Sequence, residues 1–324
     1  MSKEIVVIGP SKVGKTALVA SLEQSANVLS LAFRDDNINI SVTPKNTQTR
    51  LLFNKVLSLL ADGYLPFQGT QDLIEYEIHL SSPRIKPGLI DQLYHLLGWG
   101  ESEECKINFP DAPGGALFAG DDEEVDDVVM GDFRRTIVQK LQTAHGLIIC
   151  VDSSVLQPGK EAQKHLRSVA LAFTRWLPDI FAEVVQDKED SKLVLKRVCF
   201  VLTKSDLWAQ QNDLEDVSQA AVQNRDPYIH AKEILGQIFF NSIRKYFTRD
   251  IEVAFCMSSI YGFLDGKPHS GLIEASEQED SDDFEGIAIQ DWAPYNVIEP
   301  FIFLLNGDNI DERIKILNWD EVGS

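Results

Sequence analysis

Residues 4–22 read EIVVIGPSKVGKTALVASL, and this stretch decides the fold. The opening EIVVI is a short apolar run that predicts a buried strand, and TALVASL has the apolar spacing of a helix. Between them, GPSKVGKT at residues 9–16 fits the pattern G-x-x-x-x-G-K-[ST]. Glycines let successive backbone N–H groups point inward, and a helix N-terminus adds partial positive charge. The order of strand, loop and helix therefore predicts a site for phosphate groups.

The residues of this loop have separate expected roles. Lys15 is expected to reach the β- and γ-phosphates of a nucleoside triphosphate, and the Thr16 hydroxyl to bind Mg²⁺. A chance match on a turn between a strand and a helix is the alternative, and the correct flanking elements argue against it. Further nucleotide contacts are expected from Gly9, Ser11, Lys12, Val13, Gly14 and Ala17.

A second motif bears on the choice of base. The tetrapeptide TKSD, from Thr203 to Asp206, follows the apolar run 198–202 and resembles the [NT]-K-x-D guanine motif of GTPases. The Asp206 carboxylate can accept two hydrogen bonds from guanine, and adenine offers no such pair of donors. The stem of Lys204 can lie over the base while its ammonium braces the phosphate loop. TKSD is also a common surface tetrapeptide, but its place after a buried strand favours guanine.

Two shorter motifs occur in the matching order. Ser258, Ser259 and Ile260 follow a predicted strand, where similar proteins carry a loop whose backbone N–H meets guanine O6; Ser259 stands where Ala is usual. The tetrapeptide DAPG, from Asp111 to Gly114, fits D-x-x-G. Asp111 is expected to hold Mg²⁺ through a water, and the Gly114 N–H to sense the γ-phosphate. In isolation, DAPG is also an ordinary turn.

A threonine that closes over Mg²⁺ would complete the set, and two candidates exist. Thr70 lies in LPFQGT, immediately before the run LIEYEIHL, which predicts a strand. Thr43 lies in SVTP, ahead of a predicted helix. We favour Thr70 because it directly precedes the predicted second strand, and ordinary loop or helix-capping duty is expected of Thr43.

Taken in order over residues 5–262, these motifs resemble the TRAFAC class of P-loop GTPases. The long segment between Thr16 and Asp111 is similar in layout to the bacterial double-GTPase families of conflict systems. The resemblance implies a doubly wound α/β fold: a mostly parallel sheet of about six strands with helices on both faces, and GTP or GDP at the C-terminal strand ends. It also implies bound Mg²⁺, segments near Thr70 and Gly114 that switch, and a protein effector or activator.

One departure from the resemblance concerns hydrolysis. Gly115 follows D-x-x-G where Gln or Glu is common, so no side chain there can position water, and GTP hydrolysis by the chain alone is expected to be slow. Arg50, Arg134 and Arg135 are candidate arginine fingers, with pairing to nearby acids as the ordinary alternative. Two other functions stay open: a pseudo-GTPase that holds GTP or GDP with little hydrolysis, and an ATPase or nucleotide kinase in which TKSD is coincidental.

The organisation expected is one elaborated domain over residues 1–324. It carries an insertion at about 37–72, acidic loops at about 119–131 and 274–288, and a C-terminal helical extension at about 307–324. Strands are predicted at 5–8, 74–80, 106–109, 147–151, 198–202 and 253–256. Helices are predicted at 15–26, 46–61, 132–144, 160–185, 228–247 and 296–305, with breaks or restarts at Pro178 and Pro300.

Composition limits the partners. With 30 Lys+Arg against 50 Asp+Glu, the formal charge of −20 argues against nucleic acid or an anionic membrane surface. The apolar runs are too short to span a bilayer, and MSKEIVVIG is not a signal peptide, so a cytoplasmic location is expected. The four widely spaced cysteines are expected to be small buried strand residues in a reduced compartment. Asp152, after GLIICV, is a second possible Mg²⁺ ligand, though a capping role near the phosphate loop is favoured.

Overall fold

A computed structural model gives the architecture of the chain. It describes residues 3–10, 13–32, 40–61, 74–82, 103–111, 127–156, 161–186, 192–193, 195–211, 219–268, 292–309 and 313–322. Some of the predicted segments lie outside these ranges: the acidic segments 119–126 and 274–288, and part of the insertion at 37–72.

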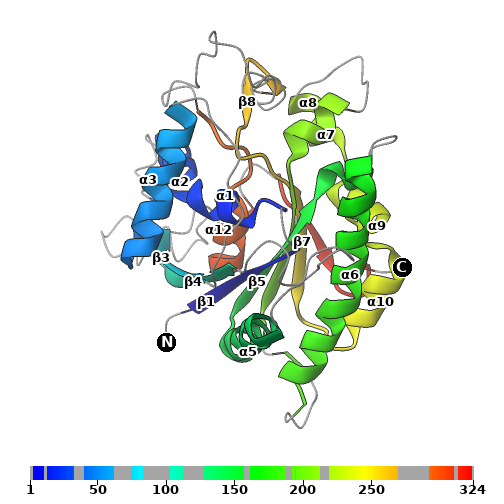
Figure 1. Cartoon of the computed structure of the whole chain (residues 1–324). Helices are drawn as coiled ribbons and strands as arrows, with labels where there is room; N and C mark the ends of the chain where they lie inside the picture. Colours follow the sequence, from blue (N-terminus) through cyan, green and yellow to red (C-terminus); the bar gives the residue numbers. More distant parts are fainter. Residues whose placement is uncertain are drawn as a thin grey trace, which may run out of the picture.

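A sheet of eight strands forms the centre of the described residues, in the order β10-β7-β6-β5-β1-β4-β3-β2 (Figure 1). From β7 to β4 the neighbouring strands are parallel, whereas β10, β3 and β2 each run antiparallel to the strand that they join. The strands are β1 (Lys3–Ile8), β2 (Ser41–Pro44), β3 (Ile74–Ser82), β4 (Glu103–Asp111), β5 (Gly146–Asp152), β6 (Arg197–Thr203), β7 (Glu252–Met257) and β10 (Lys315–Asn318), and a separate pair is β8 (Phe263–Leu264) and β9 (Lys267–Pro268).

Helices cover both faces of the sheet (Figure 1). α1, α2, α3 and α12 pack on one face, and α5, α6, α9 and α10 on the other. No helix in the described part of the chain is long and apolar enough to cross a membrane. The helices are α1 (Lys15–Ala20), α2 (Leu22–Ala32), α3 (Thr47–Ala61), α5 (Asp127–Thr143), α6 (Glu161–Val184), α7 (Ser205–Gln211), α8 (Gln219–Asn224), α9 (Pro227–Leu235), α10 (Gln237–Arg244) and α12 (Glu299–Asn306), with the 3₁₀ helix η2 (Ser153–Leu156).

The apolar runs of the central strands supply two cores at once. Along β1, Ile5 and Val7 join the core under α1 and α12, whereas Val6 and Ile8 join the core under α5 and α6. Successive side chains of a strand point to opposite faces, so a strand covered on both sides must be apolar throughout. The predicted α/β class, with a mostly parallel sheet and helices on both faces, is confirmed.

All six predicted strands form, and two edge strands were not predicted. β2 and β10 are four residues long and mostly exposed or half-buried. The predicted helical C-terminal extension is wrong over residues 315–318, which pair with β7 from Lys315 opposite Phe255 to Asn318 opposite Glu252. The edge of β7 would otherwise leave backbone groups without partners, and pairing satisfies them. The predicted acidic loop is also shorter, because 127–131 begin α5.

Four helix predictions differ in detail from the structure. α6 continues through Pro178, which removes a single backbone hydrogen bond, and Pro300 lies in the first turn of α12, where proline is tolerated. The predicted helix 228–247 is two helices, α9 and α10, separated by Gly236 at φ 79°. The first predicted helix is likewise divided at Ser21 into α1 and α2.

The cysteines lie where the sequence predicts. All four are buried and unpaired, and each is in a strand of the sheet. Burial raises the pKa of Cys105 and of Cys150 to about 12, so both thiols are protonated at neutral pH. They therefore act as small apolar side chains.

Candidate functional site

The sequence motifs lie together at the C-terminal ends of the parallel strands. β1, β4, β5, β6 and β7 are parallel, so their C-terminal ends lie together. The phosphate loop follows β1, Asp111 ends β4, Asp152 ends β5 opposite Thr203 at the end of β6, and Ser258 follows β7. Ligands of such sheets bind in the crevice at this edge.

The phosphate loop needs both of its glycines. A Cβ on Gly9 would lie 2.7 Å from the backbone oxygen of Cys150 and 3.0 Å from the Cys150 Cβ, so the loop packs directly against β5. Gly14, the residue before α1, has φ 92°, a left-handed conformation that other residues rarely adopt. The close approach and the turn together set the start of α1.

The side chains around the loop are held close to it. Lys15 is buried, and its Nζ donates to the backbone oxygen of Pro10 at 2.7 Å, so the ammonium folds back across the loop. Val13 is fully buried beneath it. Thr16 and Ala17 form the first turn of α1, where backbone N–H groups have no partner within the helix. The loop therefore presents a cation and backbone donors at one place.

Thr203 joins the guanine-type motif to the phosphate loop. Its Oγ1 lies 2.5 Å from the backbone oxygen of Val13 and 3.1 Å from that of Val151. The hydroxyl has one hydrogen, which the two acceptors share. Its own backbone oxygen accepts from Ser153 Oγ at 2.7 Å. The end of β6 is thus fixed to the loop after β1 although almost two hundred residues separate them.

Lys204 pairs with Asp152. The Lys204 Nζ lies 2.6 Å from Asp152 Oδ2, and the Asp152 side chain is buried. Asp152 Oδ1 accepts from the backbone N–H of Ser154 at 2.9 Å and from its Oγ at 2.6 Å. The carboxylate holds the Lys204 ammonium in this structure, and the expected contact of that ammonium with the phosphate loop stays a prediction. Asp152 has the capping role near the loop that the sequence favours.

Asp206 is a buried carboxylate in the first turn of α7. It is 1% exposed, and both of its oxygens lack a hydrogen bond among the described residues. Burial raises the pKa of Asp206 to about 6, against the opposing influence of the nearby Ser259 hydroxyl, local backbone N–H groups and the Lys204 charge. A buried acceptor of this kind is costly unless a ligand supplies donors. Asp206 thus meets the condition for binding a group with N–H donors.

Two hydroxyls accompany this carboxylate. Ser205 Oγ and Ser258 Oγ are buried and have no hydrogen-bond partner among the described residues. Their backbones are joined, since the Ser205 N–H donates to the Ser258 oxygen at 3.0 Å. These hydroxyls have no special signal in the sequence beyond their places in TKSD and SSI, and the sequence assigns a role only to Ser258. The Asp206 oxygens and these two hydroxyls are therefore several buried polar atoms without a hydrogen-bond partner among the described residues.

A late segment of the chain supports the loop after β7. The N–H of Ser259 donates to Tyr295 at 2.9 Å, and the N–H of Tyr295 donates back at 2.8 Å. The Trp292 Nε1 donates to the Ile260 oxygen at 2.7 Å, and the Ser259 Oγ accepts from Gly262 N–H at 3.0 Å. Sequence reasoning missed this support, because nothing near Trp292 resembles a motif. The N–H of Ser259 is thereby engaged within the protein.

Five of the predicted site residues lie outside the described residues. They are Ser11, Lys12, Thr70, Gly114 and Gly115. Their roles stay predictions.

The remaining candidates have definite places in the fold. Thr43 lies in the edge strand β2, opposite His79. Asp111 is the last residue of β4. For the candidate arginine fingers, the structure gives ordinary surroundings. Arg134 pairs with Glu183 at 2.6 Å, Arg135 pairs with Asp132 at 3.0 Å, and Arg50 is exposed on α3.

The sequence matches no protein-family model and no curated protein. Among solved structures, a chain of the signal recognition particle receptor SRb-GTP/SRX complex from Chaetomium thermophilum is 16% identical, with a TM-score of 0.37, covering 82% of this chain and 94% of that chain. The G domain of the T. maritima FeoB iron transporter is 14% identical, with a TM-score of 0.26, covering 85% and 96%.

A third structure is of the same kind. The GTPase-like domain of S. cerevisiae Ski7, bound to GDP and inorganic phosphate, is 11% identical, with a TM-score of 0.32, covering 87% of this chain and 51% of that chain. Since all three TM-scores are below 0.5, the fold assignment rests on the sheet order and the phosphate loop described above.

Proposed function

We propose that this protein binds guanine nucleotides with Mg²⁺ and hydrolyses GTP. The observation that carries the proposal is the Asp206 carboxylate, buried near the Ser259 hydroxyl with no hydrogen bond to either oxygen among the described residues. Guanine offers two adjacent N–H donors that an ionised carboxylate accepts, whereas adenine would leave the carboxylate unpaired. The preference for GTP over ATP follows from that difference.

Each part of the nucleotide has residues suited to hold it. The backbone around Gly14 and the Lys15 ammonium would bind the phosphates, and the stem of Lys204 would lie along the base. The Thr16 hydroxyl, Asp111 and Thr70 would hold Mg²⁺, which neutralises charge on the phosphate oxygens when bound. Because the N–H of Ser259 donates to Tyr295, the N–H of Ile260 is the one that would meet guanine O6.

The proposed output is a change in partner binding. The γ-phosphate would order the segments near Thr70 and Gly114, and its loss on hydrolysis would release them. A protein effector or activator would read that difference. Gly115 supports a slow intrinsic rate, because glycine has no side chain to position water. The same residue favours one second candidate, a pseudo-GTPase that holds GTP or GDP and scarcely hydrolyses it.

The base assignment is tested with Asp206→Asn. The amide reverses one hydrogen-bond polarity, so the variant should bind GTP at least about tenfold more weakly and xanthosine triphosphate more tightly than the wild type does. The matched control is Asp320→Asn, which changes a carboxylate that is 72% exposed and pairs with Arg244, and should change neither affinity. Unchanged GTP affinity in Asp206→Asn, or equal competition by ATP in the wild type, would overturn the guanine assignment.

Hydrolysis is tested in a single turnover. Protein in excess over Mg²⁺-GTP is sampled over time, and bound nucleotide is separated and identified. Conversion of bound GTP to GDP supports a GTPase that acts unaided. GTP that stays bound for hours supports the pseudo-GTPase, or a switch that needs an activator, and absence of binding contradicts the proposal altogether.

A further inference from the structure

His230 is a fully buried histidine on α9, outside the sequence motifs. Its Nε2 lies 3.1 Å from the backbone oxygen of Ser153, and its Nδ1 lies 3.3 Å from Nη2 of Arg225. A carbonyl oxygen can only accept a hydrogen bond, and a guanidinium can only donate one. These partners therefore require a hydrogen on Nε2 and a lone pair on Nδ1, which is a neutral ring. Burial and the Arg225 charge lower the pKa of His230, in agreement with that form.

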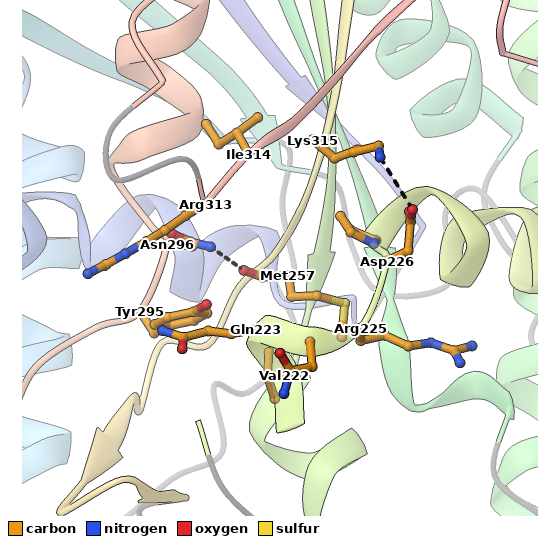
Figure 2. Close-up of a pocket in the computed structure, with 12 residues that line it drawn as sticks. Val222, Gln223, Arg225, Asp226, Met257, Tyr295, Asn296, Arg313, Ile314 and Lys315 are labelled. Atoms are coloured by element: carbon orange, nitrogen blue, oxygen red, sulfur yellow. Dashed lines mark hydrogen bonds and ion pairs between the residues drawn. The ribbon is translucent and has the colours of Figure 1, made fainter. Parts of the chain in front are cut away.

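The Arg225 side chain is held against the histidine by further contacts. Its Nη2 also donates to Glu233 Oε2, and its guanidinium carbon lies 5.7 Å from the centre of the Trp208 ring. In Figure 2 the same side chain extends away from Asn296, out of the pocket that both residues line. Glu233 Oε2 is 3.5 Å from His230 Nδ1, longer than the roughly 2.7–2.9 Å of a charge-assisted hydrogen bond, so the arginine is the closer partner of the ring.

The start of α9 is fixed, so the His230 ring has a defined position. The Asp226 carboxylate caps the helix, accepting from the N–H groups of Tyr228 at 2.9 Å and Ile229 at 3.3 Å. The Asp226 backbone oxygen accepts from the His230 N–H at 3.1 Å. The same carboxylate lies 3.5 Å from Lys315 Nζ on β10 (Figure 2). The first turn of α9 is thus tied to an edge strand of the sheet.

Through Ser153, the His230 ring contacts the residues that hold Lys204. Ser153 directly follows Asp152, whose carboxylate pairs with the Lys204 ammonium at 2.6 Å. The Ser153 Oγ donates to the backbone oxygen of Thr203 at 2.7 Å. Ser153 is therefore held by its backbone from α9 and by its side chain from β6. These two hydrogen bonds fix η2, and with it the position of the Asp152 carboxylate.

Through Trp208, the same ring contacts the helix that carries Asp206. The ring centres of His230 and Trp208 are 5.2 Å apart, at an interplanar angle of 63°. Such edge-to-face contacts have a preferred geometry. Trp208 lies on α7, two residues after Asp206, and its N–H donates to the Lys204 oxygen at 3.1 Å. His230 thus contacts both η2, which holds Lys204 through Asp152, and α7, which places Asp206.

We propose that His230, in its neutral form with a hydrogen on Nε2, is a positioning residue for guanine recognition. It holds α7 against η2, so that the Asp206 carboxylate lies at the edge of a bound base while the Lys204 stem lies along its face. Hydrogen bonds depend on direction, so a shift of α7 weakens both bonds from guanine to Asp206 together. The role rests on the proposed guanine nucleotide site and adds to it a residue that no motif predicts.

The test compares His230→Asn with His230→Gln, two amides that differ in reach. The side-chain nitrogen of Gln can take the place of Nε2 and donate to Ser153, whereas Asn is one carbon shorter and cannot. The measured quantity is the preference for GDP over inosine diphosphate, which lacks the exocyclic amine and makes only one of the two hydrogen bonds to Asp206. A purely structural role would lower both affinities alike and leave this preference unchanged.

The expected preference differs between the variants. It should be about tenfold or more in the wild type, because a hydrogen bond to a charged group is lost with inosine. It should stay within about twofold of that value in His230→Gln and fall at least about threefold in His230→Asn. Equal preferences in the wild type and a folded His230→Asn would overturn the positioning role.

A less disruptive variant keeps the test valid if His230→Asn does not fold. Arg225→Met removes the donor to Nδ1 and keeps an unbranched apolar chain over Trp208, so the preference should fall about twofold to threefold. The matched control is Arg244→Met on α10, an arginine that likewise pairs with a carboxylate, and it should leave the preference unchanged. If Arg225→Met also leaves it unchanged, the proposal is wrong.

Nitrogen NMR of the isotope-labelled full chain gives an independent readout of the ring. The His230 signals, identified by their absence in His230→Gln, should show a hydrogen on Nε2 and none on Nδ1 at neutral pH. A hydrogen on Nδ1 overturns the proposal.

Two outcomes separate the positioning role from the proposed function. A wild type that prefers GDP, with the same preference in the folded variants of His230 and Arg225, overturns the positioning role alone. A wild type that binds GDP and inosine diphosphate equally, or binds neither, overturns the guanine site and the positioning role with it.

Discussion

The Lys204 ammonium lies 2.6 Å from the Asp152 carboxylate, and this ion pair joins the ends of β6 and β5. Lys204 has φ 57°, in the left-handed region that residues other than glycine seldom adopt. The Asp152 side chain is only 6% exposed, and Ser154 fixes its other oxygen. A buried carboxylate held at both oxygens sets where the lysine stem lies, and therefore where a base would lie against it.

Asp152→Asn should weaken guanine nucleotide binding through Lys204. The amide keeps an oxygen for the Ser154 N–H but removes the charge that holds the ammonium. We expect the Kd for GDP to rise about tenfold, and the free energy of unfolding to fall by about 1–3 kcal/mol, because one partner of a largely buried pair is lost. Equilibrium titration with GDP and urea unfolding measure the two effects.

The control for this change is Asp132→Asn on α5. Asp132 pairs with Arg135 on the surface, where such a pair contributes about 0–1 kcal/mol. It should alter neither quantity beyond that. If Asp152→Asn lowers stability but leaves GDP binding unchanged, the carboxylate is structural and does not position Lys204 for the base.

Much of the fold could be predicted because its signals are local. The run EIVVI and the glycine pattern from Gly9 to Gly14 specify strand, turn and helix within twenty residues. β10 could not be predicted in that way. Its four residues, KILN, are mostly exposed, and they form a strand only because β7 offers an unpaired edge some sixty residues earlier in the chain.

In the candidate site, too, the residues of local motifs could be predicted and the long-range contacts could not. Thr203 and Asp206 belong to a tetrapeptide whose pattern names their chemistry, and both lie at the sheet edge as predicted. The partner of Lys204 was not predicted, because Asp152 lies fifty-two residues earlier and no motif joins the two. The support that Trp292 gives to Ile260 is equally long-range, over thirty-two residues. Such contacts follow from topology rather than from local sequence.

Gly9→Ala should destabilise the protein, and Gly131→Ala should stabilise it. A Cβ on Gly9 would lie 2.7 Å from the Cys150 backbone oxygen in the central strand β5, which cannot move without breaking the ladder. We expect a loss of about 1–3 kcal/mol, the usual cost of overpacking. Gly131 lies in α5 with nothing within 4 Å, so alanine should add about 0.5–1 kcal/mol. Urea unfolding compares them, and equal effects would contradict the close packing of the loop.

Asp206 should make the nucleotide-free protein less stable as pH rises. Its pKa is raised from 3.8 to about 6 in the folded state, so the folded state binds the proton more tightly than the unfolded one does. Below about pH 4 the carboxyl is largely neutral in both the folded and the unfolded state. Between about pH 4 and pH 6 it ionises in the unfolded state but stays largely neutral in the folded state, so the free energy of unfolding falls. Above about pH 6 this loss stays constant. The advantage of Asp206→Asn over the wild type should therefore be about 2 kcal/mol larger at pH 7 than at pH 4.

Unfolding free energies at several pH values measure this difference directly. Asp320→Asn is the control, because it makes the same chemical change at a carboxylate whose side chain is 72% exposed. A constant difference between wild type and Asp206→Asn would mean that Asp206 has an ordinary pKa and a hydrated or paired carboxylate.

The same carboxylate should make base binding depend on pH in the opposite direction. Guanine donates both of its N–H groups, so it binds the ionised form of Asp206, which is depleted below about pH 6. Guanosine is the suitable probe, because the phosphates of GDP titrate in the same range. Its Kd should rise about tenfold between pH 6.5 and pH 5, in proportion to the loss of ionised carboxylate. Competition against a fluorescent nucleotide at each pH gives the value, with Asp206→Asn as the variant whose weak binding should not change. If wild-type affinity for guanosine is the same at both pH values, the base does not contact Asp206.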